Sequence, residues 1–151
     1  HQHHDHVLDA GLIQERFGCP LYAYAEPSDE LTLSKLLEQM TGMPCSIDPY
    51  TIDHLIAGQV TLSLEGLTLD LLHIPGHSPD SVCFHVQGQP VVIGGDVLFN
   101  GSIGRTDFPN GSHHQLISGP KCFRQNQTHT GTSQRTGDKK SRHKEEQEFF
   151  S

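Results

Sequence analysis

A sharp change of composition near residue 119 limits how much of this chain can fold into a compact domain. Among residues 119–151 the only apolar side chains are Cys122, Phe123, Phe149 and Phe150. Such a segment cannot bury enough surface to offset the conformational entropy that ordering would cost. The charge reverses at the same place, from 14 acidic and three basic residues (net −11) to four acidic and seven basic residues (net +3). We therefore expect one folded domain over residues 1–118 and a disordered tail over residues 119–151.

The composition of the whole chain excludes several classes of protein. With 151 residues, the chain has the length of one ordinary domain, and no apolar run approaches the ~20 residues of a membrane helix. The net charge of −8 argues against nucleic acid as the main partner, because phosphate binding needs clustered Lys and Arg. The four cysteines lie far apart and form no C-x-x-C pair, so we expect a reducing, cytoplasmic location. No sequence feature sets an oligomeric state.

Helical and strand patterns alternate along residues 1–118, which is typical of an α/β fold. Apolar spacing predicts one helix over residues 7–17 that ends at Gly18, and a second helix that Ser28 caps and Gly42 ends. Alternating apolar residues predict strands at residues 21–25, 60–64, 67–71, 82–86 and 91–93, the last four as two antiparallel pairs.

Three short stretches carry side chains that can bind metal ions. The first, His-Gln-His-His-Asp-His, begins the chain and contains the potential ligands His1, His3, Asp5 and His6. An extended segment followed by a turn would aim the first two of these at one point and the last two at an adjacent point, which can serve two neighbouring ions. The second stretch presents His77 in a Pro-Gly loop, and the third presents Asp96 after two glycines. Both follow an apolar strand, where functional side chains are often found.

These motifs, H-x-H-x-D-H, P-G-H-S and G-G-D-V-L-F followed by G-S-I-G-R-T-D-F-P, resemble the metallo-β-lactamase-fold hydrolases, specifically the glyoxalase II-like (hydroxyacylglutathione hydrolase) branch. The resemblance covers residues 1–118 and implies an incomplete four-layer αββα sandwich that lacks the leading strands of the family. It also implies two divalent metal ions, zinc in the first instance, with iron and manganese left open. The implied ligands are His1, His3 and His77 for one ion, Asp5 and His6 for the other, and Asp96 as the bridge between them.

By the same resemblance, the reaction is hydrolysis of a small-molecule thioester such as S-lactoylglutathione by a metal-bound hydroxide. Two nearby cations bring the pKa of a shared water toward neutrality and polarise the carbonyl. Asp96 would hold both ions, and Asp5 would orient the attacking oxygen, so these two residues are the expected catalytic carboxylates. A thiolate leaves readily because its pKa is low compared with that of an alkoxide.

The sequence departs from the family at its later part. The family places a further histidine ligand in a late P-G-H-G loop, which this chain lacks, and His129 is the only weak candidate to replace it. We expect that the chain is truncated at its front and that the residues after about Gly119 come from a reading-frame error or an abnormal splice. Two other functions stay open: an iron-dependent persulfide dioxygenase, which shares H-x-H-x-D-H and G-R-T-D-F, and an inactive fragment of such an enzyme.

The remaining polar residues have simpler expected roles. Arg105 and Asp107 of the G-R-T-D stretch form either a buried ion pair behind the metal ligands or a substrate contact. We expect His113 and His114 to begin a helix in which their side chains are exposed.

Overall fold

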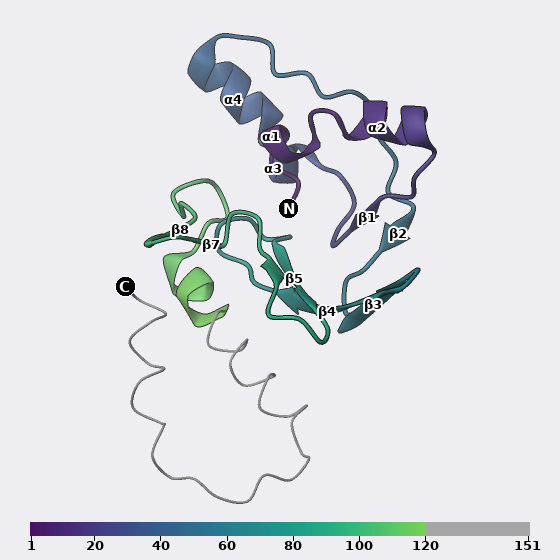
Figure 1. Ribbon diagram of the computed structural model, residues 1–151. Coiled ribbons are helices and arrows are strands. Elements are labelled where there is room, and N and C mark those ends of the chain that lie inside the picture. The colour runs from purple at the N-terminus through teal and green to yellow at the C-terminus, as the bar shows by residue number, and fades with distance from the viewer. Residues whose placement is uncertain (120–151) are drawn as a thin grey trace, which may run out of the picture.

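The computed structural model describes residues 1–119, so the expected disordered tail and the candidate ligand His129 lie outside the described residues. Within that part, helices α1–α4 lie together beside the strands, and residues 113–119 form a further helix at the other side of the sheet (Figure 1). The mixture of helices and sheets confirms the predicted α/β class. None of the described helices is long and apolar enough to cross a membrane.

The first half of the described chain is largely helical. Its elements are α1 (His4–Val7), α2 (Ala10–Phe17), β1 (Tyr22–Ala23), α3 (Asp29–Thr32), α4 (Ser34–Thr41) and β2 (His54–Leu55). The predicted end of the first helix is confirmed, because Gly18 has a φ of 60° and its N–H donates to the Gln14 carbonyl. Strand β1 is shorter than predicted and pairs in parallel with β2, which lies about 30 residues later in the chain.

The second predicted helix is divided, which the apolar spacing did not predict. Ser28 caps it as expected, since its Oγ accepts a hydrogen bond from the Leu31 N–H at 3.3 Å. Leu33 then adopts the left-handed conformation with a φ of 57° and separates α3 from α4. That side chain is only 4% exposed, so its burial offsets the cost of an unfavourable backbone conformation.

The second half contains the main sheet, with strand order β3-β4-β5-β6 and every pair antiparallel. Its strands are β3 (Thr61–Leu64), β4 (Leu67–His73), β5 (Val82–Val86) and β6 (Val92–Ile93). The two predicted strand pairs are confirmed, the first joined by a tight turn that pairs Leu64 with Leu67. A short hairpin of β7 (Leu98–Phe99) and β8 (Ser102–Ile103) follows.

Strand β4 buries side chains on both of its faces because successive residues point to opposite sides. Leu69 and Leu71 pack in one cluster with Ile56 and Val86. Leu72 packs in the other, whose remaining buried members are Ile74, Cys83, Val97 and Leu116. Leu116 belongs to the helix of residues 113–119, so that helix covers the second face of the sheet. The loops that leave β4 and β6 are therefore anchored in a packed core.

Candidate metal centre

His77 lies in the loop between β4 and β5, where close packing fixes the backbone. The preceding residue, Gly76, has a φ of 129°, and a Cβ there would lie 2.5 Å from the Leu116 nitrogen and from the Ser112 carbonyl oxygen. The Gly76 carbonyl also accepts a hydrogen bond from the Ser112 N–H at 2.8 Å. Only glycine fits at position 76. The close contact of Gly76 with Ser112 and Leu116 holds the loop against the helix of residues 113–119, and the His77 side chain is 3% exposed.

One nitrogen of the His77 ring is occupied, which determines what the other can do. The Nδ1 lies 2.8 Å from the Arg105 carbonyl oxygen and must donate, because that oxygen can only accept. The Nε2 of the neutral ring then carries a lone pair that faces the Nε2 of His1 at 3.2 Å and the Oδ2 of Asp96 at 3.6 Å. An Asp96 carboxylate cannot donate to that lone pair. A cation between these atoms would satisfy all of them, so the donor set fits a metal ion.

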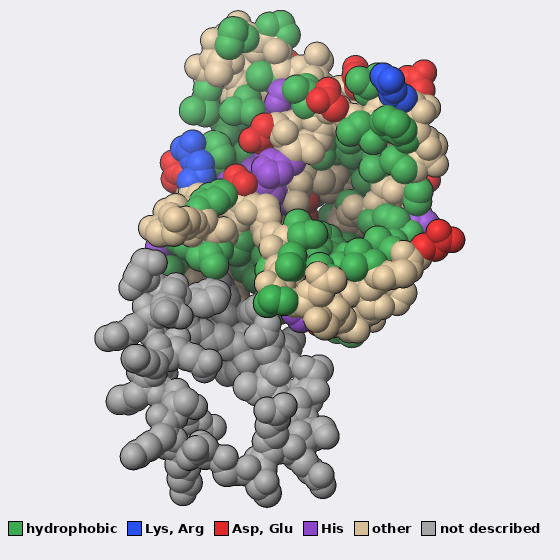
Figure 2. All heavy atoms as spheres, viewed as in Figure 1, with side chains coloured by type: hydrophobic (Ala, Val, Ile, Leu, Met, Phe, Trp, Pro, Cys, Tyr) green, Lys and Arg blue, Asp and Glu red, His purple; other side chains and the backbone are tan. Residues whose placement is uncertain are grey.

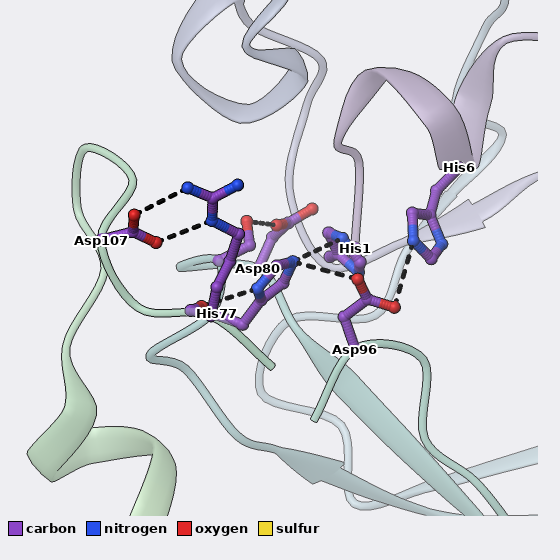
Figure 3. A network of polar contacts seen from close by, with 8 residues as sticks. His1, His6, His77, Asp80, Asp96 and Asp107 are labelled. Atoms are coloured by element: carbon purple, nitrogen blue, oxygen red, sulfur yellow. Dashed lines mark hydrogen bonds and ion pairs between the residues drawn. The ribbon is translucent and has the colours of Figure 1, made fainter. Parts of the chain in front are cut away.

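Two groups of potential ligands come together around His1. The first contains His1, His3 and His77, and the second contains His1, His6 and Asp96; within each group the ligand atoms lie within 4.8 Å of one another. Figure 3 shows His1, His77 and Asp96 pointing toward one another, with His6 reaching Asp96 from α1. Burial, with the neighbouring His77, lowers the pKa of His3 to about 4. The His3 ring is therefore neutral at pH 7, the form that binds metals.

The structure gathers five of the six predicted ligands, all except Asp5. The predicted turn after the first two ligands is present, since the His6 N–H donates to the His3 carbonyl at 2.9 Å and helix α1 follows. Asp96, a member of the second group, has one oxygen 3.4 Å from His6 and the other 3.6 Å from His77 of the first group, so its carboxylate reaches both. Asp5 is exposed on α1 and belongs to neither group.

The loop that holds Arg105 contacts the site mainly through its backbone and through Phe108. Arg105 forms two hydrogen bonds of 2.7 Å with Asp107, but their side chains are 55% and 67% exposed. The interpretation as a buried ion pair is therefore wrong, because the loop lies at the surface. The Arg105 guanidinium lies 4.1 Å from the centre of the Phe108 ring, which in turn packs edge-on against His3. Substrate contact by the exposed pair stays a prediction.

Sequence reasoning missed a buried polar network beside the ligands, formed by Gln2, Tyr50, Ser78 and Asp80. Gln2 separates His1 from His3, and Asp80 follows His77 by three residues. Their nearness to ligands was the only signal in the sequence, because the partners come from distant segments. The predicted exposure of His113 and His114 at the start of a helix is confirmed.

A cleft borders the second ligand group. Its volume is about 230 Å³, and His1, His6, Tyr22, Tyr24 and Phe84 are among its lining residues. Figure 2 shows histidine side chains at the surface near the middle of the molecule, with acidic side chains next to them. His1 and His6 are therefore accessible to a small molecule through this cleft.

Comparison with known families assigns the fold. The sequence profile of the metallo-beta-lactamase superfamily matches residues 1–132. The chain belongs to this superfamily. It carries part of the four-layer αββα fold, as predicted, and membership of the superfamily implies divalent metal binding.

Relatives in the metallo-beta-lactamase superfamily include proteins named as hydrolases. The chain is 38% identical over 122 residues to hydroxyacylglutathione hydrolase GloC of Haemophilus influenzae, a match that covers 78% of this chain and 56% of that protein. It is 35% identical over 120 residues to the probable metallo-hydrolase YqgX of Bacillus subtilis, again covering 78% and 56%. The chain therefore spans a little over half the length of these relatives.

Solved structures agree with the fold. The crystal structure of BLEG-1 B3 metallo-beta-lactamase has a TM-score of 0.70 and 32% identity, and the match covers 80% of this chain and 58% of that one. TTHA1623 in a di-iron-bound form has a TM-score of 0.66 and 29% identity, with 82% and 60% covered. The match to ETHE1 from Myxococcus xanthus, at 23% identity and a TM-score of 0.56, supports the fold alone.

Proposed function

We propose that this chain hydrolyses a small-molecule thioester such as S-lactoylglutathione and uses two divalent metal ions, zinc in the first instance. The observation that carries the proposal is the convergence of His1, His3 and His77 with the adjoining group that adds His6 and Asp96. The 38% identity to a protein named hydroxyacylglutathione hydrolase supports the thioester as substrate. Neutral imidazoles and a carboxylate are ligands that suit zinc, iron and manganese.

Different residues have separate proposed roles in binding the ions and the substrate. Divalent cations bound here would supply a polarised carbonyl and a water of lowered pKa. His77 offers its Nε2 because the Arg105 carbonyl accepts its Nδ1 proton, and Asp96 would help to hold both ions with its carboxylate. Asp5, exposed on α1, is the proposed carboxylate that orients the attacking oxygen. The cleft beside His1 and His6 would receive the acyl group.

Metal content and thioester cleavage by the full chain test this proposal. We expect the dialysed chain to retain about two equivalents of zinc, one for each ligand group, and to cleave S-lactoylglutathione. The His77→Ala variant should bind zinc more than about 100-fold more weakly than the parent. This loss exceeds the 10- to 100-fold typical of residues that contact a ligand and not the metal. The matched control is His113→Ala, which removes an exposed histidine on the helix of residues 113–119. Bound zinc with no thioester cleavage by the parent would reject the substrate.

A second candidate is an iron-dependent persulfide dioxygenase. The group of His1, His6 and Asp96 has two histidines and one carboxylate, the ligand set typical of non-haem iron oxygenases. Oxygen uptake with glutathione persulfide by the iron-loaded chain would favour this function over thioester hydrolysis. A noncooperative melt with no retained metal would instead favour an inactive fragment.

A further inference from the structure

Gln2, which lies between the potential ligands His1 and His3, is held by three hydrogen bonds. Its Nε2 donates to the Ala25 carbonyl at 2.8 Å and to Asp80 Oδ2 at 3.3 Å, and its Oε1 accepts from the Tyr50 hydroxyl at 2.9 Å. The side chain is 4% exposed. Both amide hydrogens and the amide oxygen therefore have partners, which fixes the residue between His1 and His3 in one orientation.

Asp80 connects this segment to the loop that carries His77. Its Oδ1 accepts from Ser78 Oγ, and its Oδ2 accepts from Gln2, so one hydrogen bond joins two ligand-bearing segments 78 residues apart. The His1 and His3 rings lie 4.7 Å and 4.5 Å from the His77 ring, between centres, so the ligands of the two segments meet as well. The Gln2–Asp80 bond thus fastens together the two segments that form the first ligand group.

Asp80 also places a carboxylate in the interior, and no Lys or Arg of residues 1–119 pairs with it. Its side chain is 2% exposed. A buried carboxylate held only by neutral donors is costly unless positive charge lies near it. Figure 3 draws Asp80 near His77 and His1, with its own contact to the Ser78 hydroxyl and none to either ring. A cation held by these imidazoles would supply that charge.

From this arrangement we infer that Gln2 and Asp80 are positioning residues that set the metal affinity of the first ligand group. Their hydrogen bond pre-aligns His1 and His3 with His77, and the buried Asp80 charge favours the cation-loaded state. Tyr50 supports the arrangement by fixing the Gln2 amide. The inference rests on the metal binding in the proposed function and is independent of which substrate is cleaved. Outer residues of this kind typically change metal affinity 10- to 100-fold.

A double-mutant cycle on zinc affinity tests the inference. The variants are Gln2→Met, Asp80→Ala and the double variant, each in the full 151-residue chain, with zinc affinity measured by competition against a chromophoric chelator. We expect each single variant to bind zinc about 10- to 100-fold more weakly. The double variant should match Asp80→Ala, because either single change already breaks the same bond.

The chain offers a matched control pair. Gln87 donates to Asp70 at 2.6 Å in a second Gln–Asp hydrogen bond, on the main sheet and outside both ligand groups. Gln87→Met and Asp70→Ala should leave zinc affinity within about twofold of the parent, as expected for sites with no shared partners. Equal losses from this pair and from Gln2 and Asp80 would overturn the inference, as would single losses that multiply in the double variant.

Cobalt absorption and thermal melts separate positioning from general stability. With Co²⁺ as the probe, Gln2→Met should change the visible spectrum, whereas a purely structural role would lower only the melting temperature of the metal-free chain. If Gln2→Met does not fold, Tyr50→Phe removes a single hydroxyl and should still weaken zinc binding severalfold; an unchanged affinity overturns the inference. A parent that binds no zinc rejects the proposed function too, whereas a parent that binds zinc equally well with and without these side chains rejects only the positioning role.

Discussion

The two halves of the described chain differ in how they are held together. Strands β4 and β5 bury Leu69, Leu71, Leu72, Cys83 and Val86, whereas helices α2 and α4 bury no side chain. On α2, apolar side chains such as Leu12 and Phe17 are 51% and 69% exposed. The sheet therefore presents His77 from a packed core, while the helical half presents His1 and His6 from elements held by few apolar contacts. We therefore expect bound metal to stabilise the helical half more than the sheet.

Removing the metal should have the largest effect, and it should destabilise the helical half more than the sheet half. Metal at 1,000 times its dissociation constant stabilises the folded state by about 4 kcal/mol, and chelation removes that stabilisation. We expect the amides of α1 and α2 to lose hydrogen-exchange protection on chelation, and those of β4 and β5 to retain most of theirs. Equal loss of protection in both halves would show that the sheet also depends on the metal.

Weakening the core of the sheet should have the next largest effect. Leu116 is 1% exposed between Ile74, Cys83 and Val97, so Leu116→Ala should lower the free energy of unfolding by about 3 kcal/mol. Ile117→Ala on the same helix removes a side chain that is 42% exposed and should change it by no more than about 0.5 kcal/mol. Urea unfolding of both variants measures the difference. A small loss for Leu116→Ala would mean that the loop of His77 is not held by this core.

The parts of the fold that depend on neighbouring residues were predictable, and the parts that depend on contacts between distant residues were not. The hairpin of β3 and β4 was predictable because alternation and a glycine turn are local signals. Strand β1 was predicted too long, since its partner is β2 and the pairing depends on residues about 30 positions away. The break at Leu33 was not predictable from spacing, because it depends on the burial of that side chain against the rest of the fold.

The third prediction tests the sheet core with pH. Burial raises the pKa of the Cys83 thiol to about 11 from an ordinary value near 9, so the folded state favours the neutral thiol. The resulting stability is fully present below pH 9 and is lost as the pH rises toward 11, about 1 kcal/mol of it by pH 10. The free energy of unfolding of the metal-free chain should therefore fall more between pH 7.5 and 10 than that of Cys83→Val. An equal fall in both would place the thiol outside the core.

In the metal site, too, the features set by local sequence were predictable, whereas the contacts between distant segments were not. The convergence of the potential ligands was predictable, because residue types and motif spacing point to such groups before any contact is known; they are His1, His3, His6, His77 and Asp96. The Gln2–Asp80 bond was not predictable, since it joins side chains from segments whose approach is decided by the whole fold. Arg105 and Asp107 are an intermediate case. Their pairing follows from a separation of two residues, but their exposure depends on how the loop lies on the core.

The smallest effect is expected from Asp107→Asn. This variant tests whether the Arg105 backbone or the Arg105–Asp107 ion pair orients His77. The Arg105 guanidinium holds the pKa of Asp107 well below its usual range, so the pair is ionised at neutral pH, yet both side chains are exposed and screened by solvent. His77 is oriented by the Arg105 carbonyl, which the substitution keeps. Zinc affinity measured by chelator competition should therefore stay within about twofold of the parent, with no resolvable change in melting temperature. A tenfold loss of zinc affinity would mean that the ion pair itself holds the loop against His77, and that the packed core of the sheet half is not enough to place this ring.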